Sequence, residues 1–122
     1  MMVLMVAIGG AIGSVLRYWT TILSVQCLGT SFPFGTLIVN VLGSFILGLM
    51  LSAVEFNILL SPYWKPLITV GLLGGFTTFS TFSFDTLALF MQGEYIKGGL
   101  NIALNLVLGL MAVSLGYYLL KQ

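Results

Sequence analysis

Four long apolar stretches dominate this sequence, and each is about the length of one membrane-spanning helix. A helix needs about 20 mostly apolar residues to cross the hydrocarbon of a bilayer. The stretches lie at residues 3–24, 34–54, 66–90 and 99–120. The segments between them carry the prolines, glycines and charges that are typical of loops. We therefore expect one all-α integral membrane domain of four transmembrane helices over residues 1–122.

The shortage of charged side chains supports a membrane protein. The chain has four basic and three acidic residues, and 59% of it is hydrophobic. In a soluble domain about a quarter of the residues are charged. The sequence also lacks histidine and contains one cysteine, so it offers no cluster of groups for hydrolysis or transition-metal binding. We expect neither an enzyme nor a nucleic-acid partner.

The basic residues give almost no preference for one orientation in the membrane. With four spans, Lys65 and Lys121 fall on the same side as the N-terminus, whereas Lys97 falls on the other side, to which Arg17 lies nearer. An excess of basic residues on one side normally sets the orientation. A chain without this excess is able to insert both ways up, and the two forms would pair as an antiparallel dimer. Insertion in one orientation is the alternative.

Two charged residues lie within the predicted spans. Arg17 is near the end of the first span, and Asp85 is near the same end of the third. Charges in a membrane pair, reach the headgroups or mark an ion pathway. A structural ion pair between these residues, a snorkelling Arg17, and an arginine that attracts anions at the mouth of a pathway are all compatible with the sequence.

Asparagines form a second set of polar residues in the membrane. Asn40 lies in the second span, and Asn101 and Asn105 lie four residues apart in the fourth, hence on one helix face. Each amide offers two N–H donors and one acceptor. They predict either hydrogen bonds between helices or part of a polar lining.

The stretch GGFTTFSTFSFD, residues 74–85, combines four phenylalanines with five hydroxyl side chains. Glycine weakens a helix, and we expect the third helix to be broken here. Broken helices in membranes are buried in protein or line an ion path, and the freed carbonyl oxygens suit a hard cation such as Na⁺. Phenylalanine ring edges carry partial positive charge and would suit a small anion, although ordinary packing is the alternative role for these rings.

These residues resemble the Fluc (CrcB) fluoride channel family. The resemblance extends over nearly the whole chain. It rests on GGAIGSVLRYW, GTLIVNVLGS, WKPLITVGLLGGFTTFSTFSFD and NIALNLVLG, of which GGFTTFSTFS is the most specific. It implies a passive fluoride channel in the inner (plasma) membrane that lowers cytoplasmic fluoride and confers fluoride resistance. It also implies an antiparallel, dual-topology homodimer with two pores, and pairing with a close paralogue is the alternative.

The resemblance assigns roles to individual residues. The backbone carbonyls of Gly74 and Thr77 would hold a structural Na⁺ at the dimer centre. The edges of Phe79 and Phe82 would line the pores, and Arg17 matches the family's first-helix arginine. The pore donors would be Asn40, Ser80 and Thr81.

The sequence departs from similar sequences at two positions. A serine often stands where this chain has Gly109, which leaves the lining from the fourth helix open, and Asn105 is one candidate to supply it. Asp85 replaces a residue that is often glutamate.

Two other classes of function remain. Small multidrug exporters couple protons through a carboxylate in the first helix, and the first span has neither Asp nor Glu. A purely structural subunit would explain the small residues at four-residue spacing but not the stripe of hydroxyls and amides. These small-residue pairs, which favour close helix packing, are Gly9 and Gly13, Ser44 and Gly48, and Ala112 and Gly116. Anion flux without a proton gradient separates these classes from a channel.

Overall fold

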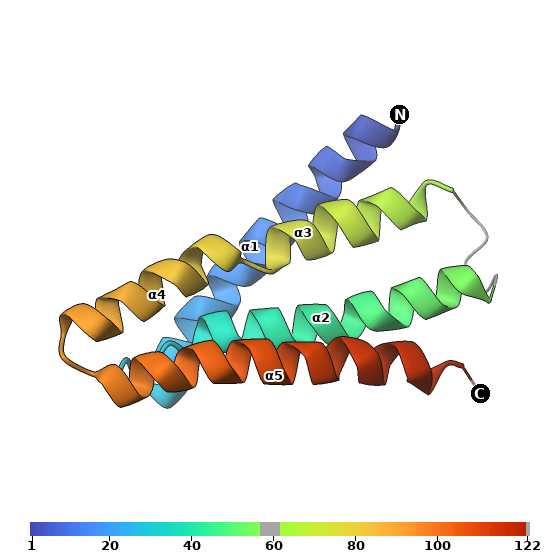
Figure 1. The fold of residues 1–122 in the computed structure, drawn as a ribbon. Coiled ribbons are helices and arrows are strands. Elements are labelled where there is room, and N and C mark those ends of the chain that lie inside the picture. Colours follow the sequence, from blue (N-terminus) through green and yellow to red (C-terminus); the bar gives the residue numbers. More distant parts are fainter. Residues whose placement is uncertain (57–61, 122) are drawn as a thin grey trace.

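The computed structural model describes residues 1–56 and 62–121, and all regular structure within these ranges is helical. Helix α1 spans Met2–Leu28, α2 spans Phe34–Glu55, and α5 spans Tyr95–Leu119. Between α2 and α5 lies a third span, Pro66–Met91. All four are long and apolar enough to cross a membrane. The expected four-helix membrane fold is confirmed (Figure 1).

The helix bounds differ from the predicted ones mainly at two ends. The last helix begins at Tyr95 rather than at residue 99, directly after a turn in which Gly93 has a φ of 79°. Helix α1 continues to Leu28 rather than ending at residue 24. Hydropathy marks the part of a helix that lies in hydrocarbon, whereas its polar first and last turns extend into the headgroup region.

The third span is broken, as predicted. It consists of a π-helical turn, η1 (Pro66–Leu72), a short helix α3 (Leu73–Phe76) and a longer helix α4 (Phe79–Met91). Residues Thr77 and Thr78 between them are extended, with ψ values of 156° and 118°. The two glycines of the motif lie within α3 rather than at the break.

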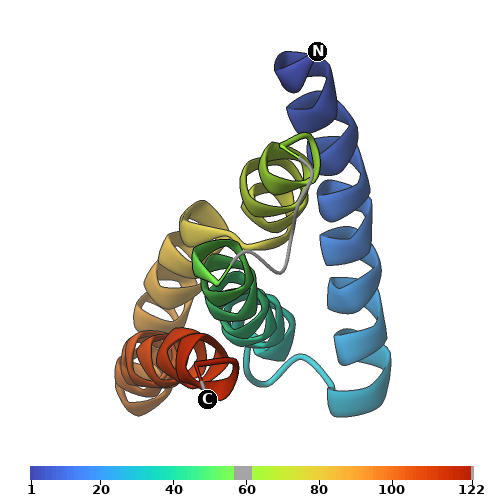
Figure 2. The same cartoon turned by 90° about the vertical axis from the view of Figure 1, so that its right-hand side faces the viewer.

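Glycines allow the helices to approach closely. Helix α1 packs against η1 and α3, and α2 packs along α5, as Figures 1 and 2 show. A Cβ on Gly13 would meet the Leu72 carbonyl, and one on Gly48 would meet the Val113 carbonyl. Small residues permit such contacts between helices in membranes. Both of these glycines therefore allow helices to pack closely within the chain.

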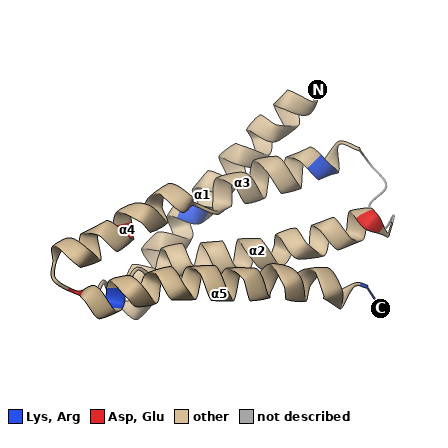
Figure 3. Cartoon of the chain, viewed as in Figure 1, with Lys and Arg blue, Asp and Glu red and all other residues tan. Residues whose placement is uncertain are grey.

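The interior is more polar than the surface. Asn101 is fully buried and Asn105 nearly so, whereas Leu110 on the same helix is 67% exposed. Five of the seven charged residues lie near the two ends of the bundle, whereas Arg17 lies within α1 and Asp85 lies within α4 (Figure 3). This arrangement suits a chain surrounded by lipid, where polar groups turn inward.

Candidate functional site

Asn40 holds the break in the third span. Its Oδ1 accepts a hydrogen bond from the Thr78 N–H at 2.8 Å, and its Nδ2 donates to the Thr78 carbonyl at 3.2 Å. One amide side chain on α2 thus pairs with both polar groups of one extended residue. Thr78 also caps α4, because its Oγ1 accepts from the Thr81 N–H at 3.1 Å. The break is therefore stabilised from both sides.

These side-chain bonds free two backbone carbonyls. In a continuous helix, the Gly74 carbonyl would accept from the N–H of Thr78, and the Thr77 carbonyl from that of Thr81. Those two N–H groups bond to the side chains of Asn40 and Thr78 instead. The residues predicted to provide cation ligands are thus those whose carbonyls lose their helical partners. A Cβ added at Gly74 would meet no atom within 4 Å, so this position faces open space.

A chain of buried amides links Asn40 to α4 through α5. Asn40 Nδ2 also donates to Asn105 Oδ1 at 2.9 Å, and Asn105 Nδ2 donates to Asn101 Oδ1 and to the Asn101 carbonyl at 3.0 and 2.8 Å. Asn101 Nδ2 then donates to Thr86 Oγ1 at 2.9 Å. Asn101 forms hydrogen bonds between helices, whereas Asn105 does so and also lines a cavity. Both N–H groups of Asn40 are used within the chain.

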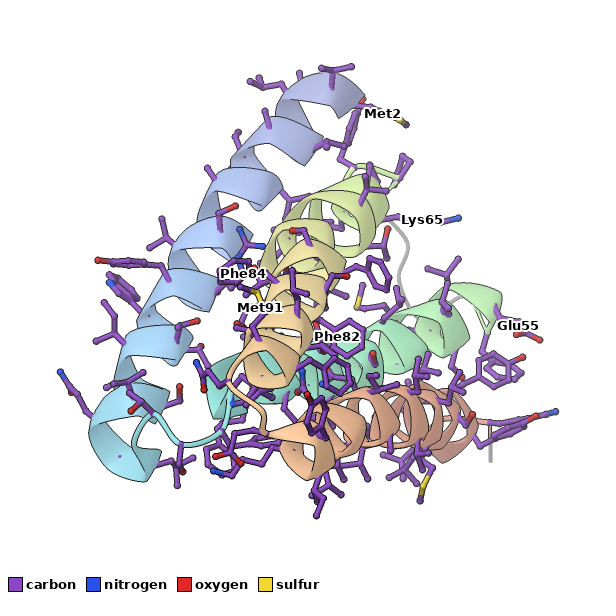
Figure 4. All side chains as sticks on the ribbon, turned by 60° about the vertical axis from the view of Figure 1, so that its left-hand side comes forward. Met2, Glu55, Lys65, Phe82, Phe84 and Met91 are labelled. Atoms are coloured by element: carbon purple, nitrogen blue, oxygen red, sulfur yellow. The ribbon has the colours of Figure 1, made fainter. Side chains whose placement is uncertain are left out.

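That cavity, about 370 Å³ in volume, lies among α2, α3, α4 and α5. It brings together Asn40, Phe79, Phe82 and Asn105. The two phenylalanine rings have centroids 5.6 Å apart and are tilted by 46°. Phe82 extends from α4 toward α2 and α5 (Figure 4), and Phe79 is 77% exposed. We call this space the phenylalanine cavity.

A second hollow lies on the other side of the break. Its volume is about 430 Å³, and its lining includes Arg17, Thr36, Thr78 and Thr81. Thr78 lines both spaces, so the break separates the phenylalanine cavity from this arginine-lined hollow. Ser80 is exposed, and its Oγ lies 3.3 Å from Thr78 Oγ1, within hydrogen-bond distance. The predicted pore residues are therefore not arranged along one wall: an amide and two phenylalanines line one space, Thr81 lines the other, and Ser80 lines neither.

Arg17 and Asp85 do not form an ion pair with each other. The carboxylate of Asp85 accepts a hydrogen bond from Thr36 Oγ1 at 2.7 Å. Among residues 1–56 and 62–121, the one ion pair joins Lys97 and Glu94, 4.0 Å apart. The ion-pair alternative is thus not found, because equal depth along two helices does not make their side chains face each other. Arg17 lines the hollow instead.

Sequence reasoning missed three residues of the site. Thr78 lies at the centre of the break. Threonine is a favoured N-cap residue, so the sequence could have predicted that Thr78 caps a helix by accepting from the N–H of Thr81. Thr36 holds Asp85. Ser44 lines the phenylalanine cavity. The sequence did not indicate this role, because the four-residue spacing of Ser44 and Gly48 predicts close helix packing instead.

The chain is similar to proteins of known family over nearly its whole length. Residues 4–117 match the family described as CrcB-like protein, Camphor Resistance (CrcB). A protein of Shewanella amazonensis named fluoride-specific ion channel FluC is 57% identical over 118 residues, which are 97% of this chain and 94% of that protein.

Two further relatives with the same printed name agree. The protein of Shewanella oneidensis is 53% identical, covering 95% of this chain and 93% of its own length. The protein of Vibrio vulnificus is 48% identical, covering 96% and 93%. From the family match and these identities, the chain belongs to the CrcB family.

Proposed function

We propose that the chain is the subunit of a passive, fluoride-selective ion channel, and not an enzyme. The observation that carries this proposal is the 57% identity, over nearly the full length, to a protein named fluoride-specific ion channel. The geometry agrees with it, because an amide, a hydroxyl and two phenylalanine rings of the predicted pore set line two spaces on either side of a helix break, and Arg17 lines one of these spaces.

The channel would act in the inner membrane and lower cytoplasmic fluoride. Neutral HF crosses lipid and ionises inside the cell, where the pH is higher, so the anion is trapped. A membrane potential that is negative inside favours its exit by about 2.3 kcal/mol per 100 mV. A selective pore is then sufficient, and no energy-coupling site is needed.

Weak, neutral sites suit conduction of this ion. Fluoride holds its water strongly, so a pore must offset the loss of hydration with donors. Ring edges of Phe79 and Phe82 and the O–H of Thr81, whose oxygen accepts from Thr78 Oγ1, provide partial positive charge. A full charge in mid-pore would bind the anion too tightly to release it. Arg17 lies in the hollow beyond the break, where its charge attracts anions. An anion that reaches Asn40 competes with the Thr78 carbonyl for the longer of two hydrogen bonds.

The working unit would be an antiparallel homodimer of the single domain, in contact with membrane lipid. The nearly balanced basic residues favour dual insertion. The exposed ring of Phe79 and the open space beside Gly74 are consistent with a face that a second copy completes. A close paralogue in place of the second copy would satisfy the same face.

A structural Na⁺ fits the residues at the break. Gly74 and Thr77 would hold it through neutral carbonyl oxygens, and those two carbonyls lack their usual helical donors. Such oxygens suit a hard cation, and ligands without formal charge favour a monovalent ion over Ca²⁺. The ion would supply positive charge that joins two copies of the break.

Fluoride flux is the decisive measurement for the channel. Liposomes that contain the purified protein, loaded with fluoride and given no proton gradient, are expected to release it, whereas chloride-loaded liposomes retain chloride. Cells that lack the gene should grow poorly in fluoride and normally in chloride. Release that requires a proton gradient would indicate an exporter, and the absence of release would contradict the channel.

Removal of Na⁺ is expected to weaken the assembly and the flux together. Purified protein is equilibrated for a long time in a bulky organic cation in place of Na⁺. We expect fluoride flux to fall about tenfold or more and the dimer to dissociate at lower denaturant concentration, because a ligand that binds the folded state stabilises it. Flux and dimer stability that do not respond to Na⁺ would contradict the site.

A further inference from the structure

Most hydrogen-bond donors on the wall of the phenylalanine cavity are already used. The polar side chains on this wall are Asn40, Ser44, Thr69, Thr77, Thr78 and Asn105. Thr69 and Thr77 each donate to a carbonyl four residues earlier, at 2.6 and 2.9 Å. Thr78 Oγ1 donates to Thr81 Oγ1 at 3.1 Å. The amides of Asn40 and Asn105 each make two donated hydrogen bonds.

Ser44 is the exception on this wall. Its hydroxyl has no hydrogen-bond partner among residues 1–56 and 62–121. Hydroxyls in membrane helices usually donate to the carbonyl four residues earlier, as Ser83 and Ser114 do here at 3.0 and 2.8 Å. Ser44 does not, although it lies in the middle of α2 and is half-buried.

Gly109 leaves the space beside this hydroxyl open. A Cβ built on Gly109 would lie 3.8 Å from Ser44 Oγ, and that oxygen is the one atom it would meet within 4 Å. The contact is an ordinary one, so a small side chain fits here. In this chain the hydroxyl comes from Ser44 on α2, and the facing position on α5 is Gly109, which has no side chain.

We propose that Ser44 is an anion-binding residue of the pore, the hydroxyl donor that the phenylalanine cavity offers to fluoride. The proposal rests on the proposed channel function and adds a residue to its pathway. An anion in this cavity meets ring edges from Phe79 and Phe82, and Ser44 supplies the free O–H. No existing hydrogen bond has to break for this contact, in contrast to a contact with Asn40 or Asn105.

The test compares three variants with the parent in fluoride-release liposomes. Ser44→Ala is expected to lower flux about tenfold or more, because a hydrogen bond to an ion is among the stronger ones. The double variant S44A/G109S returns a hydroxyl to the same space from α5 and should recover most of the flux. Ser114→Ala is the matched control, since its exposed hydroxyl donates only to its own helix, and it should conduct like the parent.

The outcomes separate this proposal from the channel itself. If the parent releases fluoride and Ser44→Ala releases it equally fast, Ser44 is not a binding residue and the channel stands. A defect in Ser44→Ala that S44A/G109S does not reduce would also overturn the proposal, because rescue from another helix depends on the hydroxyl alone. Failure of the parent to conduct would contradict the channel. If Ser44→Ala does not fold, Ser44→Cys keeps the size with a weaker donor, and unchanged flux in it overturns the proposal.

Discussion

Replacing either Phe79 or Phe82 with isoleucine is expected to reduce fluoride flux by about a hundredfold, or about 2.7 kcal/mol in the conduction barrier. Isoleucine keeps the apolar bulk but has no ring, so the partial positive charge of the edge is lost. Both rings line the phenylalanine cavity, and neither is needed to fill a buried core. Fluoride release from liposomes measures the effect, while size-exclusion chromatography shows that the variants still fold and assemble.

Phe84→Ile is the matched control for this experiment. Phe84 lies on the same helix and is 67% exposed, and it lines neither the phenylalanine cavity nor the arginine-lined hollow. We expect parental flux from it. Phe90 is a second control outside the pathway, although its ring packs against Gly98 and Tyr95, so its replacement also leaves a small void. If Phe79→Ile and Phe82→Ile conducted like the parent, both rings would be ordinary packing residues.

The sequence allowed the fold to be predicted well because membrane helices follow one simple rule. Every backbone group must bond within its own segment where lipid surrounds it, so length and hydropathy identified all four spans. The break was also predictable, because glycines weaken a helix and a cluster of hydroxyl side chains at membrane depth is typical of a broken helix that is buried or lines an ion path. Its position was not predictable from local sequence. Gly74 and Gly75 stay helical, and the chain opens at Thr77 and Thr78.

The position of the break depends on a residue far away in the chain. Asn40 precedes Thr78 by 38 residues. Helix propensities describe the local sequence only, so they cannot predict this contact. The same limit applies to Asp85, whose partner is Thr36 rather than Arg17. Hydropathy gives the depth of a side chain in the membrane, but its direction around the helix axis depends on how neighbouring helices pack.

Small residues show the limit of reading motifs. Ser44 and Gly48 have the spacing of a packing pair, and Gly48 does meet the backbone of α5. Ser44, one turn earlier, lines the phenylalanine cavity instead. Helices α2 and α5 therefore pack closely at Gly48 but leave space one turn earlier, at Ser44, where the cavity lies.

Asn40→Asp is expected to abolish detectable fluoride flux and to destabilise the protein. A carboxylate retains one oxygen to accept from the Thr78 N–H, but its other oxygen faces the Thr78 carbonyl and Asn105 Oδ1, which are acceptors as well. Each buried acceptor that loses its donor costs about 1–3 kcal/mol, so the free energy of unfolding should fall by about 2–6 kcal/mol. The added negative charge also repels the anion. Liposome flux and thermal melting in detergent measure the two effects.

The amide of Asn105 cannot turn to rescue this variant, because both of its N–H groups donate to Asn101. Asn40→Ala separates the loss of stability from the effect of the added charge, since it removes the hydrogen bonds to Thr78 and Asn105 without adding a charge. It should melt at a lower temperature than the parent and conduct poorly. Ser83→Ala is the control, because this exposed hydroxyl donates only to the Phe79 carbonyl, and it should match the parent in both assays. Parental flux and melting in Asn40→Asp would mean that the break holds without Asn40, and that the amide neither braces the pathway nor lines it.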